Sequence, residues 1–220
     1  ARHSAQFGAA GGGYGHKRQI NAAGTRSRAS VCAMLATPSK NTLHLIEATP
    51  ADLDRIMELE RQGFAAGHRE ERAAYAQRID VFPQGALMAW REEDCVGCVF
   101  SELWPAAPQL DAAHFKLGHD IRERHDPVHG TELYISSMTL APTVRGQGLG
   151  APLLLGCLAH VAQACPQVQT AVLLVNAAWP PARRVYASVG FVEVARLQGF
   201  FDADDGVRQD GIVMRRSMGL

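Results

Sequence analysis

The stretch that decides the fold is Arg145-Gly146-Gln147-Gly148-Leu149-Gly150, a glycine-bearing turn between an apolar run and a helical run. The apolar run covers residues 133–140, and the helical run covers residues 151–158. The first turn of a helix carries backbone N–H groups without a partner in the helix, and the helix dipole adds about half a positive charge there. Glycines let the backbone approach a phosphate closely. This order of strand, turn and helix therefore predicts a site for a phosphorylated cofactor.

Two common phosphate-binding motifs do not fit this turn. A P-loop ends in Gly-Lys-Ser or Gly-Lys-Thr, and the chain contains neither. A dinucleotide-binding fingerprint has the spacing G-x-G-x-x-G, with an acid about twenty residues later. Here the glycines stand at 146, 148 and 150, and no acid follows until Glu193. The pattern that fits is [Arg/Gln]-x-x-Gly-x-[Gly/Ala], which Arg145, Gly148 and Gly150 fill.

This pattern is the acetyl-CoA signature of the GNAT superfamily of N-acetyltransferases, and a second landmark of that superfamily follows it. The landmark Ala-x-x-x-Tyr-x-x-x-Gly-Phe is filled by Ala182, Tyr186, Gly190 and Phe191. The chain therefore resembles a GNAT acetyltransferase over roughly residues 42 to 217. Three segments are similar to the arylalkylamine N-acetyltransferase branch, namely residues 82–85, 125–130 and 133–136.

The resemblance implies an α/β (α+β) fold, the GNAT fold. Its mixed central sheet has six to seven strands, is splayed between the fourth and fifth strands, and is flanked by about four helices. From the sequence we expect strands at 42–48, 86–91, 95–103, 132–140, 168–175, 191–199 and 207–216. We expect helices at 50–62, 69–78, 148–164 and 181–188, with a short helix within 111–124. Residues 41–220 would form a single acetyltransferase domain.

The charge of the chain is balanced, with 22 basic and 22 acidic residues, but the two signs are unevenly distributed. No acid precedes Glu47, and residues 1–40 are rich in Gly, Ala, Ser and Arg. We expect this segment to be a disordered or targeting-like tail. The expected location is the cytoplasm, or a plastid or mitochondrion if the tail is a transit peptide. The mildly acidic remainder argues against a nucleic-acid partner, and no apolar stretch is long enough for a membrane span.

Cysteines and acidic clusters give no reason to expect a metal. Five cysteines at irregular spacing indicate a reducing compartment. Cys95 and Cys98 lie in an expected strand, where residues three apart point to opposite faces, so we expect core positions. The acidic turn at 202–206 lacks the spacing and closing Glu of a calcium loop.

The resemblance assigns cofactor contacts to three parts of the chain. The diphosphate of acetyl-CoA would bind backbone N–H groups of the turn, at Gly146, Gln147, Gly148, Leu149, Gly150 and Ala151. Arg145 would either contact a phosphate or brace the turn. The pantetheine arm would pair with the strand edge at Met138, Thr139 and Leu140. Asn176 ends its strand where relatives place a pantetheine-binding Asn, although the usual spacing of seven residues before the tyrosine falls on Trp179.

The expected catalytic residues are Tyr186 and Ser136. By resemblance, the Tyr186 hydroxyl protonates the leaving thiolate. Animal members of the arylalkylamine branch carry two histidines on the central strand, and Tyr134 and Ser136 occupy those positions here. Replacement bases would be His125, His129 or Glu132, through bound water, or the enzyme captures the neutral fraction of the amine without a base.

The expected activity is acetyl transfer from acetyl-CoA to a small primary amine, an arylalkylamine by the closest resemblance, by direct attack in a ternary complex. Alternatives are acetylation of a protein N-terminus or lysine, and a catalytically silent acetyl-CoA-binding module. A protein acceptor predicts an open groove, whereas a small amine predicts a roofed pocket. The chain would act as a monomer or homodimer. Five aromatic residues are candidates for either the amine pocket or the core: Phe64, Tyr75, Phe82, Trp104 and Phe115.

Overall fold

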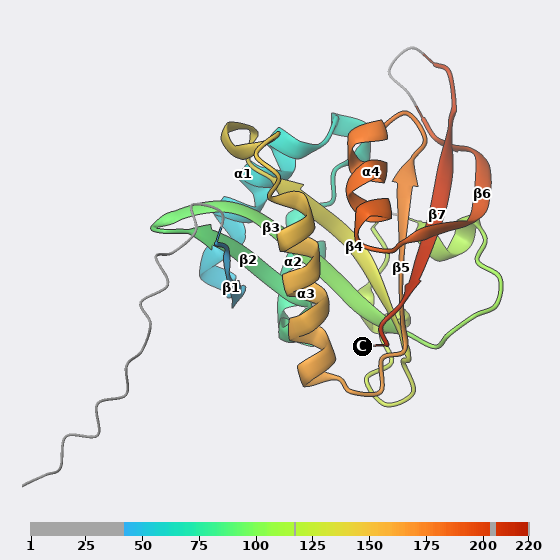
Figure 1. The fold of residues 1–220 in the computed structure, drawn as a ribbon, viewed down its shortest axis with the longest axis horizontal. Coiled ribbons are helices and arrows are strands. Elements are labelled where there is room, and N and C mark those ends of the chain that lie inside the picture. The colour runs from blue at the N-terminus through green and yellow to red at the C-terminus, as the bar shows by residue number, and fades with distance from the viewer. Residues whose placement is uncertain (1–41, 117, 203–205, 220) are drawn as a thin grey trace, which may run out of the picture. The chain divides into compact units, whose positions relative to one another are not determined.

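The computed structural model describes residues 42–116, 118–202 and 206–219 (Figure 1). The tail expected at 1–40 and the centre of the expected turn at 202–206 lie outside these residues. The described chain contains a seven-stranded sheet in the order β1-β2-β3-β4-β5-β7-β6. Its strands are β1 (His44–Glu47), β2 (Ala86–Arg91), β3 (Asp94–Trp104), β4 (Glu132–Leu140), β5 (Thr170–Asn176), β6 (Val192–Phe201) and β7 (Gln209–Ser217). All neighbours pair antiparallel except β4 and β5, which are parallel.

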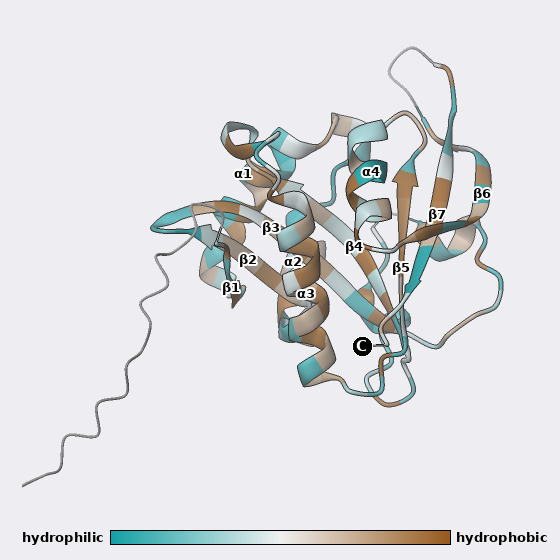
Figure 2. Cartoon of the chain, viewed as in Figure 1, coloured by the Kyte–Doolittle hydropathy of each residue, from teal (hydrophilic) through white to brown (hydrophobic). Residues whose placement is uncertain are grey.

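Four α-helices cover the two faces of this sheet: α1 (Leu53–Gly63), α2 (Arg72–Val81), α3 (Gly150–Ala164) and α4 (Pro180–Ser188). Leu87 packs in the core that α3 covers, and its neighbour Met88 packs against α1 and α2. This alternation follows from the two-residue period of a strand. Apolar residues accordingly line the strands and α3, and polar residues gather at the tip of the β2–β3 hairpin (Figure 2). The GNAT fold expected from the sequence is confirmed.

Within the described ranges, six short 3₁₀ turns join these elements: η1 (Pro50–Asp52), η2 (Ala66–His68), η3 (Pro83–Gly85), η4 (Ala112–Phe115), η5 (Ile121–Glu123) and η6 (Pro142–Val144). The expectation of a helix within 111–124 is wrong, because two 3₁₀ turns, η4 and η5, occupy this range instead. Asp111 and Asp120 each cap one of these turns with a side-chain oxygen. Gly118 has a φ of 69°, a left-handed conformation that does not continue a right-handed helix.

The parallel pairing of β4 and β5 covers only part of their length. It runs from Glu132 opposite Thr170 to Ile135 opposite Leu173 and stops there. Beyond this point β4 continues to Leu140 along β3, and β5 continues to Asn176 along β7. The expected splay between the fourth and fifth strands is therefore present, and it leaves one edge of residues 136–140 without a strand partner among the residues that the structure describes.

Two β-bulges change which way side chains point. In β4, Ser137 pairs with Phe100 and Ile135 with Ser101, so Ser136 is the extra residue. In β3, Cys95 pairs with Trp90 and Gly97 with Ala89, so Val96 is the extra residue. The second bulge corrects our expectation for Cys95 and Cys98, which lie in the same core cluster rather than on opposite faces. Both are buried free thiols, as a core position requires.

Candidate active site at the splayed strands

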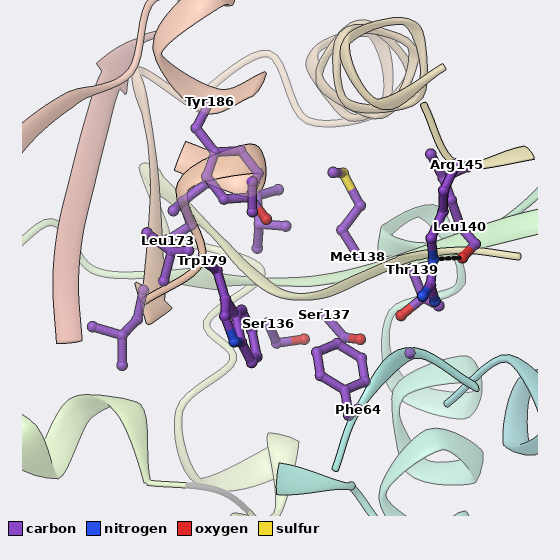
Figure 3. Close-up of a pocket in the computed structure, with 15 residues that line it drawn as sticks. Phe64, Ser136, Ser137, Met138, Thr139, Leu140, Arg145, Leu173, Trp179 and Tyr186 are labelled. Atoms are coloured by element: carbon purple, nitrogen blue, oxygen red, sulfur yellow. Dashed lines mark hydrogen bonds between the residues drawn. The ribbon is translucent and has the colours of Figure 1, made fainter. Parts of the chain in front are cut away.

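A cavity of about 210 Å³ occupies the gap between β4 and β5. Its walls come from the end of α1, the unpaired half of β4, the end of β5 and the start of α4. Figure 3 shows Met138 and Tyr186 on one side of the β4 ribbon and Ser136, Ser137 and Phe64 on the other. The cavity therefore joins the face covered by α3 and α4 to the face covered by α1 and α2.

The glycine turn leads from β4 into α3 beside this cavity. Gly146 and Gly148 each have a φ of 77°, a left-handed conformation that favours glycine. An added Cβ at either position would meet nothing within 4 Å, so backbone conformation rather than space requires these two glycines. Gly150 is favoured by close packing instead, because an added Cβ would lie 3.1 Å from the side chain of Val185 in α4.

The backbone at this helix start is suited to an anion. α3 begins at Gly150, and the N–H groups of Gly150 and Ala151 have no acceptor within the helix. Pro152 follows and has no N–H to satisfy. Leu149 is 1% exposed and packs in the core, so only its backbone faces the turn. The predicted diphosphate contacts at 146–151 thus lie together at the tip of one helix.

Two polar side chains hold the turn in place. The Arg145 guanidinium donates through Nε to the Leu140 carbonyl oxygen and through Nη2 to the Gln62 carbonyl oxygen, each over 3.0 Å. Gln147 accepts from Arg91 at 2.7 Å and donates to the Thr143 carbonyl oxygen at 2.9 Å. Of the two roles expected for Arg145, these contacts favour bracing the turn, in this case against α1.

The unpaired half of β4 carries a polar atom without a partner. Thr139 is 4% exposed, lines the cavity, and its Oγ1 has no hydrogen-bond partner within the described chain. Leaving a buried hydroxyl unpaired costs about 1–3 kcal/mol, which a polar ligand in the gap would recover. The three predicted pantetheine contacts, Met138, Thr139 and Leu140, all line the cavity. An extended arm carrying amides fits this strip of free strand edge and free hydroxyl.

Tyr186 reaches the cavity from α4, on the side of β4 where Met138 lies (Figure 3). Its ring packs 6.2 Å from that of Phe191, the last residue of the second motif. Burial raises the pKa of Tyr186 from 10 to about 12. The phenol therefore remains protonated at neutral pH and can donate a hydrogen bond into the cavity.

The other side of the gap carries two adjacent hydroxyls. Ser136, the bulge residue, donates through Oγ to the Phe100 carbonyl oxygen over 3.2 Å. Ser137 is buried, lines the same cavity, and its Oγ lies 3.3 Å from the Tyr75 hydroxyl. The bulge brings both serines to the cavity, a placement that strict alternation along β4 would not give.

Four aromatic side chains pack on one another, and two of them reach the cavity that these serines line. We call them the aromatic cluster: Phe64, His68, Trp179 and Phe201. Phe64 and Trp179 line the cavity, with ring centroids 6.1 Å apart. His68 packs on Trp179 at 6.3 Å and on Phe201 at 5.5 Å. The cluster therefore joins the α1–α2 connection, the β5–α4 loop and the end of β6. Its only member among the aromatic candidates from the sequence is Phe64.

The remaining aromatic candidates are core residues. Tyr75 packs with α1, α2 and β3, Phe82 packs in the core beneath α3, and Trp104 and Phe115 pack around Tyr134. The Tyr134 ring stacks on Trp104 at 4.1 Å, and burial raises the pKa of its phenol. Tyr134 does not line the cavity.

Asn176 does not line the cavity either. It is 2% exposed, its amide donates to Gln209 at 2.7 Å, and its side-chain oxygen accepts from the Ala178 N–H at 2.8 Å. These contacts fix the end of β5 and the loop that follows it. Trp179, where the family spacing falls, does reach the cavity.

The three candidate bases lie at the other end of β4. Glu132 is the first residue of this strand, is 1% exposed, and pairs with Arg215. His125 accepts from the Leu103 N–H at 3.1 Å, and burial lowers the pKa of its imidazole. His129 is exposed and pairs with Asp126. None of the three lines the cavity.

The described residues hold neither a group of metal ligands nor a membrane-spanning helix. Across residues 42–116, 118–202 and 206–219, no three His, Cys, Asp or Glu side chains are grouped to hold a metal ion. None of the helices described here has the length and apolar character to cross a membrane.

Solved structures with the same fold include enzymes with different activities. One is a GphF GNAT-like decarboxylase in complex with isobutyryl-CoA, with a TM-score of 0.66 and 20% identity, over 80% of this chain and 100% of that chain. Another is the ribosomal-protein-S18-alanine N-acetyltransferase from Escherichia coli, with a TM-score of 0.61 and 16% identity, over 81% of this chain and 96% of that chain. A third is Arabidopsis thaliana NAA60 in complex with a bisubstrate analogue, with a TM-score of 0.56 and 22% identity, over 80% of this chain and 98% of that chain. No curated protein matches the sequence.

The family assignment rests on the sequence as well as on the fold. The seven-stranded sheet, its four helices and the splay after Ile135 define a protein of the GNAT fold. The family model of the acetyltransferase (GNAT) family matches residues 53–191. The chain belongs to the acetyltransferase (GNAT) family and is an acetyl-CoA-dependent acetyltransferase.

Proposed function

We propose that this protein transfers the acetyl group of acetyl-CoA to a small primary amine, with arylalkylamines as the first class to test. The amine attacks the thioester directly, with both substrates bound. The observation that carries this proposal is the aromatic cluster, which contributes Phe64 and Trp179 to the wall of the cavity. A cavity of about 210 Å³ with two aromatic side chains in its wall suits a small amine better than an extended peptide.

The cofactor side of the site binds acetyl-CoA through backbone groups. The helix tip at 146–151 offers N–H groups and a positive dipole end to the diphosphate. The free edge of β4 at Met138, Thr139 and Leu140 pairs with the pantetheine arm, and one of its N–H groups polarises the acetyl carbonyl. Oriented donors of this kind contribute about 3 kcal/mol to transition-state stabilisation.

Tyr186 stabilises the leaving sulfur. Its pKa of about 12 exceeds that of a thiol, about 8.5, so full proton transfer from the phenol to the thiolate is uphill. Donation of a hydrogen bond to the developing negative charge needs no such transfer. We therefore assign Tyr186 as the donor to the leaving thiolate, which then takes its proton from the attacking amine.

The acceptor side of the site recognises a cation that carries an apolar group. Phe64 and Trp179 present ring surface to the cavity, and an ammonium near an aromatic face gains about 0.5–2 kcal/mol. The Ser136 oxygen lies beside these rings, where it orients the amine by accepting one of its N–H groups (Figure 3). Acceptor rings of phenethylamine or tryptamine would pack against the same two side chains.

A thiol-release assay with acetyl-CoA tests this proposal. The acceptor panel contains phenethylamine, tryptamine, a short alkylamine, lysine and peptides with free N-termini. Turnover that is fastest with the two arylalkylamines supports the proposal. Turnover with peptides alone favours a protein acceptor, and acetyl-CoA binding without turnover on any acceptor favours a silent binding module.

A further inference from the structure

A chain of three polar side chains leads from the serine side of the cavity into the core. Ser137 lines the cavity, and its Oγ lies 3.3 Å from the Tyr75 hydroxyl. That hydroxyl donates to Glu60 Oε2 over 2.7 Å. Tyr75 is 0% exposed and Glu60 2% exposed. The three residues come from β4, α2 and α1, so the fold alone brings them into line.

The hydrogen-bonding capacity of these groups gives the chain a direction. An ionised carboxylate only accepts, so the single proton of Tyr75 is directed to Glu60. The lone pairs of the Tyr75 oxygen are then free to accept the Ser137 proton. The lone pairs of Ser137 in turn face the cavity, where they can accept an N–H of the acceptor.

The surroundings of Glu60 make it more basic than an ordinary carboxylate. Burial raises the pKa of Glu60, and hydrogen bonds from the Glu70 N–H and from Tyr75 oppose that effect. The charged groups nearby are Glu70, which repels its negative charge, and Arg78, which attracts it. Arg78 is ion-paired with Glu70 at 2.8 Å, and the nearby Cys98 thiol is neutral because burial raises its pKa.

We propose that Ser137, Tyr75 and Glu60 form the proton relay that deprotonates the acceptor ammonium. This inference rests on the proposed function, because it supplies the base for that reaction. One N–H bond of the ammonium breaks as its proton passes to Ser137 Oγ. The Ser137 proton moves to the Tyr75 oxygen, and the Tyr75 proton moves to Glu60 Oε2. The net change is a neutral amine and a protonated Glu60 carboxyl.

The remaining protons balance without another reactant. After attack on the thioester, the nitrogen loses a second proton to the leaving thiolate, which departs as free CoA. Glu60 returns its proton through the same chain to solvent when the amide has left. The relay therefore resets in each turnover, and none of its members is consumed.

The test compares two acceptors that differ in their need for a base. One is an alkylamine that is protonated at the assay pH, and the other is an amine that is already neutral. The variants are Tyr75→Phe, Glu60→Gln and Ser137→Ala. Tyr134→Phe is the matched control, since it removes a buried phenol hydroxyl that is outside the cavity. Acetyl-CoA affinity is measured by calorimetry for each protein.

We expect the three variants to lose about 100-fold in kcat/KM with the protonated amine, within the range of general base catalysis. We expect losses within about threefold for the neutral amine, and unchanged acetyl-CoA affinity. Equal losses for both amines, or no loss, would overturn the relay. If Glu60→Gln does not fold, Tyr75→Phe carries the test, because it keeps the ring.

The turnover measurements distinguish failure of the proposed function from failure of the relay. A wild-type protein that turns over no amine at all removes the proposed function and the relay with it. A wild-type protein that acetylates amines, together with a Tyr75→Phe variant of equal activity on the protonated amine, removes the relay alone.

Discussion

Ile135 and Leu173 form the last parallel pair between β4 and β5, and both line the cavity that opens where the pairing ends. The next residue, Ser136, is a bulge, so β4 turns both serines and Thr139 towards the gap. The same strand segment thus provides a free edge on one side and two hydroxyls on the other. This arrangement lets one short stretch of chain serve both the cofactor and the acceptor.

The glycine turn gives a first prediction. Gly148→Ala should destabilise the protein by about 1–2 kcal/mol, because an L-residue must adopt a left-handed φ of 77° there. It should also weaken acetyl-CoA binding by displacing the backbone N–H groups of the turn. Thermal unfolding and calorimetry measure the two effects. Gly67→Ala is the control, since its site has open space and no positive φ. Equal behaviour of the two variants would contradict this prediction.

A second prediction concerns Tyr186. Tyr186→Phe should lower kcat by about 10- to 1,000-fold, because one donor to developing charge is lost. The acetyl-CoA affinity should stay within about threefold, since the ring and its packing remain. Tyr134→Phe should leave kcat within about twofold, because that hydroxyl does not reach the cavity. A kcat for Tyr186→Phe equal to that of the wild type would remove the assigned role.

Trp179 gives a third prediction, on acceptor choice. Trp179→Ala should raise KM for phenethylamine by about 5- to 50-fold, because a packing surface for the acceptor ring is lost. A short alkylamine, which lacks that ring, should be affected much less. Steady-state kinetics with both amines in the same variant provide the comparison. A uniform loss for both acceptors would argue against a contact between Trp179 and the acceptor ring.

The fourth prediction follows from the pKa of Glu60, which burial raises above its ordinary value of 4.5. Between 4.5 and that raised pKa, the folded protein holds a proton that the unfolded chain has lost. The stability contributed by this group is therefore present at acid pH and lost as pH rises through the folded pKa. Glu60→Gln cannot lose that proton. The Tm of Glu60→Gln minus the Tm of the wild type should therefore increase with pH above 4.5. A Tm difference that does not change with pH would contradict the raised pKa.

Much of the fold was predictable because its signals are local. β2 and β4 were expected at 86–91 and 132–140, the bounds that the structure shows. The helices after the glycine turn and before Gly190 were expected within two residues of their observed starts. An apolar run, a glycine turn and a landmark tyrosine are contained in short stretches of sequence, so each can be recognised without knowledge of its neighbours.

The details that shape the site were less accessible, because they depend on residues far apart in the chain. A bulge such as that at Ser136 depends on the register with β3, which the β4 sequence does not encode alone. The ring contact of Trp179 with His68 and the hydrogen bond of Tyr75 with Glu60 both join residues from different elements, which only the folded chain brings together. The bases expected from the sequence, His125, His129 and Glu132, lie near the start of β4, whereas the buried carboxylate of Glu60 comes from α1 and connects to the cavity through Tyr75 and Ser137.

Hydrogen–deuterium exchange with and without acetyl-CoA tests the central claim most directly. If acetyl-CoA binds along the splayed strand and the glycine turn, it should slow amide exchange at residues 136–151 and leave β2, at 86–91, unchanged. Absence of any protection in 136–151, at acetyl-CoA concentrations that saturate the protein, would contradict this account of the site.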